Sequence, residues 1–73
     1  MNPMLHIRTV VLRLTQAEMA QIAGAGQAAV SRWENGATAP TRRQLERIRL
    51  EAMARGLDWD DSWFFETPAE AAR

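Results

Sequence analysis

Apolar residues recur at helical spacing along most of the chain, and this pattern predicts an all-α protein. Near the N-terminus the spacing is three, four and three residues, which places an apolar stripe on one side of a helix. This stripe consists of Met4, Ile7, Val11 and Leu14. Asn2 and Pro3 just before it are a typical N-cap and first-turn pair. We therefore expect a single helix here, with Leu12 off the stripe.

The stretch QAEMAQIAGAGQAAVSRWEN, residues 16–35, has the pattern of two short helices joined by a tight turn. Thr15 and Glu18 match a capping box, so the first helix is expected to begin at Gln16. Gly24 can adopt a positive φ where that helix must end. Gly26 is an acceptable N-cap for the second helix, which leaves room for only a short turn.

The second of these helices has two distinct sides. Val30 and Trp33, three residues apart, are expected to face inward. The other side carries Gln27, Ala28, Ser31 and Arg32. Ala20 and Ala23 in the first helix are small enough for two helices to cross closely. The pattern therefore predicts a helix-turn-helix that docks on duplex DNA.

The outward side chains of residues 27–32 have the chemistry that reads base edges. Gln27 can pair with adenine, Arg32 can donate two hydrogen bonds to guanine, and the Ala28 methyl can touch a thymine methyl. Each good bidentate contact contributes about 1–3 kcal/mol of discrimination between bases. We expect base contacts from these residues and from Ser31, with modest specificity for one monomer.

A further helix is expected from Thr41, because Thr41 and Gln44 match a second capping box. Its buried stripe is predicted to be Leu45, Ile48 and Ala52, with Gly56 at its C-terminal end. Arg42 and Arg43 in its first turn oppose the helix dipole, an arrangement that favours a bound anion such as a DNA phosphate. The alternative, two solvated arginines, stays open.

The segment after this helix concentrates aromatic residues: Trp59, Trp63, Phe64 and Phe65. Trp59 and Phe64 are expected to close the core. A domain this small cannot readily bury all four rings, so a subunit contact is expected for the others. The predicted dimer interface comprises Leu50, Met53, Leu57, Trp63 and Phe65. Residues 1–66 are expected to form one domain and residues 67–73 a frayed tail.

Charge is unevenly distributed along the chain, although its formal net value is zero. Residues 1–55 hold eight arginines and four acidic residues, a net charge of +4, whereas residues 56–73 carry −4. A basic body with an acidic tail suits DNA binding on one side. All the cations are arginines, which suits forked contacts to phosphate and guanine, but a GC-rich genome would give the same bias.

Other functional classes find little support in the composition. The chain has no cysteine and a single histidine, His6, for which a surface or packing role is expected rather than a ligand role. Asp58, Asp60 and Asp61 lack the rest of a calcium loop. Ser31 and Ser62 lack the partners of a catalytic triad. We therefore expect no enzyme activity, no metal, no cofactor and no membrane span, and a cytoplasmic protein.

The pattern LTQAEMAQIAGAGQAAVSRWENGATAP resembles the Cro and phage-repressor family of helix-turn-helix regulators, also called the XRE family. The resemblance covers roughly residues 8–57. It rests on Thr15, Gln16, Ala20, Gly24, Val30, Trp33, Glu34, Asn35, Gly36 and Pro40. The departures are Arg13, where the family often has glycine, Gly26, where serine is frequent, and the short Ala28 and Ala29.

This resemblance implies a five-helix, lambda-repressor-like DNA-binding domain whose second motif helix enters the major groove. It implies a phosphate contact for Gln16 and base contacts for Gln27, Ala28 and Arg32. The full set of expected DNA-backbone contacts is Thr15, Gln16, Asn35, Thr38, Arg42 and Arg43. The expected partners are double-stranded DNA and a second copy of the chain, in a bacterial or phage setting.

Two functional hypotheses follow from the sequence. The first is a dimeric, sequence-specific repressor that occludes a promoter at a palindromic operator. The alternative is an antitoxin or adaptor whose acidic, aromatic C-terminal segment binds a protein partner.

Overall fold

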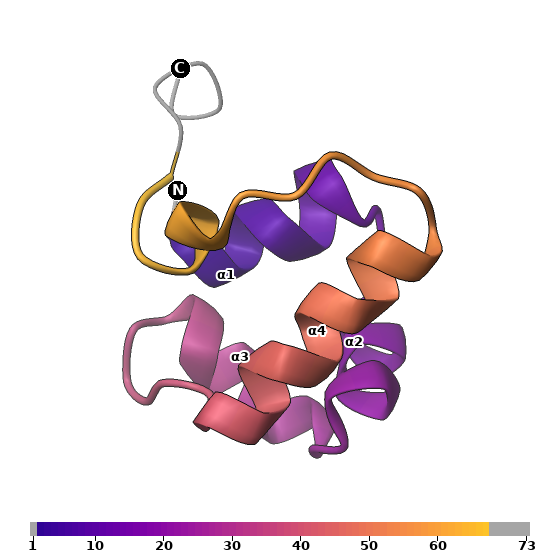
Figure 1. The fold of residues 1–73 in the computed structure, drawn as a ribbon. Helices are drawn as coiled ribbons and strands as arrows, with labels where there is room; N and C mark the ends of the chain where they lie inside the picture. Colours follow the sequence, from indigo (N-terminus) through magenta and orange to yellow (C-terminus); the bar gives the residue numbers. More distant parts are fainter. Residues whose placement is uncertain (1, 68–73) are drawn as a thin grey trace.

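The structure, a computed structural model, describes residues 2–67. Within them lie α1 (Pro3–His6), η1 (Ile7–Val11), α2 (Gln16–Ala23), α3 (Gln27–Glu34), α4 (Arg42–Ala54) and η2 (Asp61–Phe64), as Figure 1 shows. The all-α class is confirmed for the described residues. The expected count of five helices is not, because they form four α-helices, a π-helical segment (η1) and a single 3₁₀ turn (η2). The predicted tail lies outside the described residues from position 68 onward.

The N-terminal segment is helical but does not run on to Leu14 as expected. Pro3–His6 is α-helical, and from Ile7 the turns widen to π-helical geometry, in which Leu12 N–H donates to the Ile7 carbonyl at 2.9 Å. The wider turn shifts the register, so Leu12 is buried and Val11 is only half buried. Leu14 is buried as predicted, but from the loop that follows.

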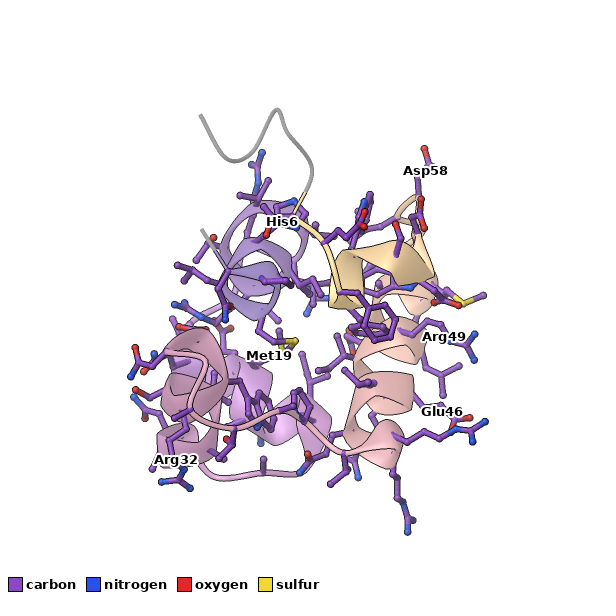
Figure 2. All side chains as sticks on the ribbon, turned by 90° about the vertical axis from the view of Figure 1, so that its left-hand side faces the viewer. His6, Met19, Arg32, Glu46, Arg49 and Asp58 are labelled. Atoms are coloured by element: carbon purple, nitrogen blue, oxygen red, sulfur yellow. The ribbon has the colours of Figure 1, made fainter. Side chains whose placement is uncertain are left out.

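The core lies where α1, η1, α2, α3 and α4 meet. Its fully buried large side chains are Ile7, Met19, Val30 and Ile48, one from each of four elements. Burying a side chain of this size contributes about 1.5–3 kcal/mol. Figure 2 shows Met19 between the N-terminal segment and the helix pair below it. The predicted inward stripes of α3 and α4 are therefore confirmed, with Leu45 half buried at the edge.

The chain reverses after α4 and returns across the molecule to α1 (Figure 1). Gly56 has φ +72°, and Leu57 N–H donates to the Ala52 carbonyl at 3.1 Å, which confirms the predicted glycine stop. The Asp60 side chain then accepts from Ser62 N–H at 2.9 Å and starts η2. η2 ends after this single turn at Phe64, so within the described residues the aromatic segment does not form a fifth α-helix.

Candidate nucleic-acid interface

The turn between α2 and α3 has the predicted geometry. Gly24 has φ +72° and ends α2, and its N–H points back to the carbonyls of Ala20 and Gln21. Gly26 lies in extended backbone (φ −87°) as the N-cap of α3, without a side-chain hydrogen bond. Ala20 and Ala23 are both buried, as expected where two helices cross closely.

A link from α4 also holds this turn in place. The Arg47 Nε donates to the Ile22 carbonyl at 2.9 Å, near the C-terminal end of α2. A Cβ built on Gly24 would lie 2.9 Å from the Arg47 guanidinium. Gly24 is therefore required for its positive φ, whereas the guanidinium of the exposed, flexible Arg47 side chain can shift to admit a Cβ.

The two sides of α3 differ as the sequence predicted. Val30 and Trp33 are 1% and 3% exposed and anchor the helix against the core. Gln27, Ala28 and Arg32 are exposed, and Ser31 is half buried. Figure 2 shows Arg32 projecting from the edge of the molecule, whereas α4 carries Arg49 and Glu46 on a different side. The candidate base-reading side chains are therefore available to a ligand.

A polar network fixes both ends of the motif. The Arg8 guanidinium donates to both carboxylate oxygens of Glu34, at the end of α3, through its Nε and Nη2 atoms. The Gln16 Nε2, at the start of α2, donates to Glu34 Oε1 at 3.0 Å. Arg8 Nη1 also donates to the Leu14 carbonyl at 2.9 Å. One guanidinium and one carboxylate therefore join η1, the loop before α2, and both motif helices.

Glu34 is ionised in this network, as the direction of its pKa shows. Burial alone raises the pKa of the Glu34 carboxyl, but the hydrogen bonds from Arg8 and Gln16, with the Arg8 charge, bring it below its usual value. The hydrogen bond to Glu34 correspondingly raises the pKa of Arg8. The positive charge of Arg8 is therefore paired with Glu34 within the protein.

The expected backbone-contact residues lie at the starts of α2 and α4 and just after α3. Thr15 caps α2, because its hydroxyl accepts from the Glu18 N–H at 3.1 Å. The Thr15 N–H in turn donates to the Glu18 carboxylate, and this hydrogen bond lowers the pKa of the Glu18 carboxyl. Thr38 and Asn35 are exposed. Thr41 caps α4 together with Gln44, which confirms the second capping box.

Three exposed arginines are available to an anionic ligand at the predicted DNA-contact positions: Arg32, Arg42 and Arg43. Within the described residues, none of them has a carboxylate within ion-pair distance, whereas Arg49 and Arg55 are paired with Asp61 and Glu51. These three cations suit phosphate or guanine.

A family model described as helix-turn-helix matches residues 12–58, which include both motif helices and α4. The chain belongs to this helix-turn-helix family, of the Cro and XRE type. No curated protein and no solved structure matched the chain. Membership makes it a DNA-binding transcription regulator in general terms, in a family that is generally not enzymatic.

Sequence reasoning missed two residues that shape this helix-turn-helix protein. Arg8 was counted only as a positive charge, although it holds Glu34 across 26 positions of sequence. Asn2 was expected only as an N-cap, yet its Nδ2 also donates to the Trp33 carbonyl at 2.9 Å in the last turn of α3. Neither contact has a local signal, because both depend on how distant segments meet.

The aromatic segment divides into packed and exposed rings. Trp59 and Phe64 pack against the core, as expected. Trp63, expected at a dimer interface, is half buried within the monomer, edge-on to His6 and to Trp59 with ring centroids 5.8 and 5.4 Å apart. Phe65 is 76% exposed. Trp63 therefore contributes to the fold, while Phe65 is available for a contact.

Of the two roles expected for His6, surface or packing, the structure shows packing. It is buried, and its Nδ1 has no hydrogen-bond partner among the described residues. Burial lowers the pKa of this imidazole, so His6 is neutral at neutral pH.

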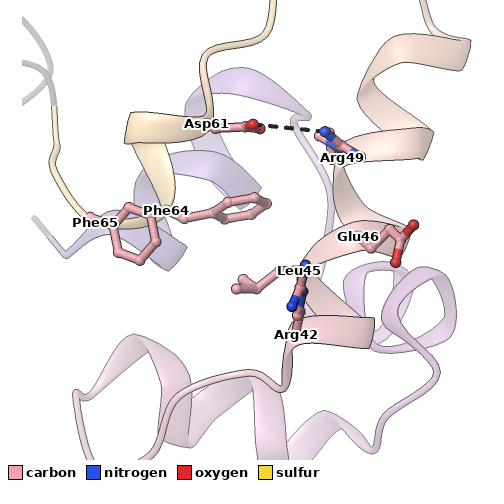
Figure 3. A pocket seen from close by; sticks show the side chains of 7 residues that line it. All are labelled: Arg42, Leu45, Glu46, Arg49, Asp61, Phe64 and Phe65. Atoms are coloured by element: carbon pink, nitrogen blue, oxygen red, sulfur yellow. Dashed lines mark ion pairs between the residues drawn. The ribbon is translucent and has the colours of Figure 1, made fainter.

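A groove of about 290 Å³ lies between α4 and η2. Figure 3 shows Phe64 pointing into it toward Leu45, with Phe65 at its edge and the Arg49–Asp61 ion pair across it. On the outer side of α4, Leu50 and Met53 are each more than half exposed, and Leu57 is about one-third exposed. This apolar surface is distinct from the outward face of α3.

Metal binding and membrane crossing each require an arrangement that residues 2–67 do not contain. No group of three or more histidine and carboxylate side chains there is arranged to hold a metal ion. No helix within residues 2–67 has the length and apolar character required to cross a bilayer.

Proposed function

We propose that this protein is a sequence-specific repressor that binds double-stranded DNA as a homodimer and occludes a promoter. The outward face of α3 carries this proposal: exposed Gln27, Ala28 and Arg32 are held by two buried anchors, Val30 and Trp33. In this arrangement α3 enters the major groove. Thr15, Gln16, Asn35, Thr38, Arg42 and Arg43 contact the backbone on either side.

The specificity test compares three variants in a gel-shift assay with DNA from directly upstream of the coding sequence. Arg32→Ala should weaken specific binding and relax the preference at one base pair by about 1–3 kcal/mol. Arg32→Lys is the matched control, because it keeps the charge and loses only the forked pair of donors. Arg42→Ala should weaken binding to all sequences alike and reduce the salt dependence. Unchanged affinity for both alanine variants would reject the groove assignment.

The homodimer is proposed to form through Leu50, Met53, Leu57 and Phe65, the exposed apolar side chains on α4 and beyond it. The described chain measures 29 × 27 × 21 Å between Cα atoms. A palindrome read by two such copies requires their equivalent helices to lie about 34 Å apart, one turn of DNA.

Sedimentation at micromolar concentration tests this dimer. Phe65→Ala and Met53→Ala should lower the dimer fraction, whereas Val10→Ala, which truncates another exposed apolar side chain on η1, should not. A monomeric wild-type protein would reject the homodimer. The exposed Phe65 beside the groove would then favour the second candidate function, an antitoxin or adaptor that binds a protein partner there.

A further inference from the structure

Arg13 has an unusual backbone conformation. Its φ of +55° is in the left-handed region. Among the described residues, Arg13 is the only residue other than glycine with a positive φ. Side chains with a Cβ are disfavoured there, whereas glycine adopts this conformation without steric cost. An arginine at this position therefore strains the fold.

The surrounding loop imposes this conformation. Leu12 and Leu14 on either side of Arg13 are both buried. Leu14 N–H donates to the Arg8 carbonyl at 2.8 Å, and the Leu14 carbonyl accepts from Arg8 Nη1 at 2.9 Å. Both neighbours are thus held in place, and the chain between them turns through Arg13.

The side chain of Arg13 makes no contact that offsets this strain. Arg13 is exposed, and it has no hydrogen bond or ion pair within the part of the chain that the structure describes. Strain without an internal compensation is a feature from which a functional role can be inferred and then tested.

The position of Arg13 suggests a ligand for its charge. It precedes Thr15, the N-cap of α2, by two residues, so their Cα atoms are at most about 7 Å apart. The other charges near this end do not provide a free cation. Arg8 is committed to Glu34, Glu18 is acidic, and Arg55 is paired with Glu51.

We propose that Arg13 binds a phosphate of the DNA backbone beside the N-terminus of α2. This inference rests on the proposed function, in which Thr15 and Gln16 approach the same strand. Arg42 and Arg43 lie at the start of α4, and among the described residues beside the N-terminus of α2, Arg13 is the cation without a carboxylate partner. Arg13 contributes to the affinity for DNA equally for all DNA sequences.

The test is a substitution that should raise the melting temperature of the protein and lower its affinity for DNA. Arg13→Gly relieves the strain and removes the cation, so its melting temperature should rise by several degrees. Its affinity for duplex DNA should fall about five-fold at 0.15 M salt. The slope of log K against log salt should become less steep by about 0.9, the value for one phosphate contact.

Two matched variants separate charge from strain. Arg13→Gln removes the charge without supplying glycine's freedom, so it should weaken binding without raising the melting temperature. Arg13→Lys should retain the wild-type salt slope. The loss in Arg13→Gly should be equal on operator and unrelated DNA, unlike the loss in Arg32→Ala.

The outcomes distinguish this inference from the function on which it rests. If wild-type protein binds its operator with a steep salt dependence and Arg13→Gly keeps the same slope, the phosphate contact is wrong and the proposed function stands. If wild-type protein shows no salt-dependent duplex binding, both are overturned.

Discussion

Replacing Arg8 should severely weaken the fold, because Arg8 is the main partner of a buried carboxylate. The Arg8 and Glu34 side chains are 15% and 7% exposed. Arg8→Met keeps much of the apolar stem and removes the guanidinium. The Glu34 carboxylate then retains the Gln16 amide as its hydrogen-bond partner in the described structure.

The magnitude follows from the bonds that are lost. A hydrogen bond to a charged group contributes about 1.5–3 kcal/mol, and removing one partner of a buried ion pair costs about 3–5 kcal/mol. Because the Arg8 side chain is partly exposed, we take the lower end, about 3 kcal/mol. A 73-residue domain has about 4–11 kcal/mol in total. The melting temperature should therefore fall by about 12–24 °C.

A double-mutant cycle isolates the interaction between the two side chains. Arg8→Met, Glu34→Met and the double variant are unfolded in urea, followed by far-ultraviolet circular dichroism. The double variant leaves no unpaired charge, so it should be more stable than the sum of the single effects predicts. We expect a coupling energy of about 2 kcal/mol.

A small coupling energy would refute this reasoning. Exposed ion pairs give about 0.2–1 kcal/mol in such cycles. A value below about 0.5 kcal/mol would show that solvent screens the pair. Glu34 would then not depend on Arg8 to remain charged, and some other contact would hold the two ends of the motif.

The remaining predictions concern the turn, the helix crossing and the buried histidine. Gly24→Ser should cost about 1–2 kcal/mol because of its φ of +72°, whereas Gly26→Ser should gain a few tenths of a kcal/mol by capping α3; urea unfolding measures both. Ala23→Leu should cost about 1–3 kcal/mol in the same assay by overpacking the crossing of α2 and α3. His6 has a lowered pKa in the folded protein, so as the pH falls the unfolded chain binds a proton at His6 first, and stability should fall as the pH drops below about 6.5. The His6→Phe variant should lose less stability between pH 7 and pH 5 than the wild type. An equal loss in both proteins would contradict this role of His6.

The parts of the fold that sequence predicted best are those with signals a few residues apart. Thr15 with Glu18, and Thr41 with Gln44, set the starts of α2 and α4, and the glycine at position 24 sets the turn. Each signal is a local hydrogen-bond or backbone preference, so it depends little on the rest of the molecule.

The parts that sequence could not predict depend on segments far apart in the chain. The π-helical turns after Ile7 adjust the register so that Leu12 meets the core, which periodicity within one helix cannot show. The place of Trp63 depends on the return of the chain to His6, and an aromatic residue has equal apolar character at a core or an interface. The outward face of α3 could be predicted, because its two anchors are three residues apart.

The bond from Asn2 to the Trp33 carbonyl has a practical consequence for how the protein is handled. It couples the first described residue to the last turn of the helix proposed to read DNA. A purification tag fused ahead of Asn2 would disturb this hydrogen bond. The resulting loss of affinity in a binding assay would look like the effect of a weak operator sequence. Tags for such assays should therefore be fused at the C-terminal end of the chain.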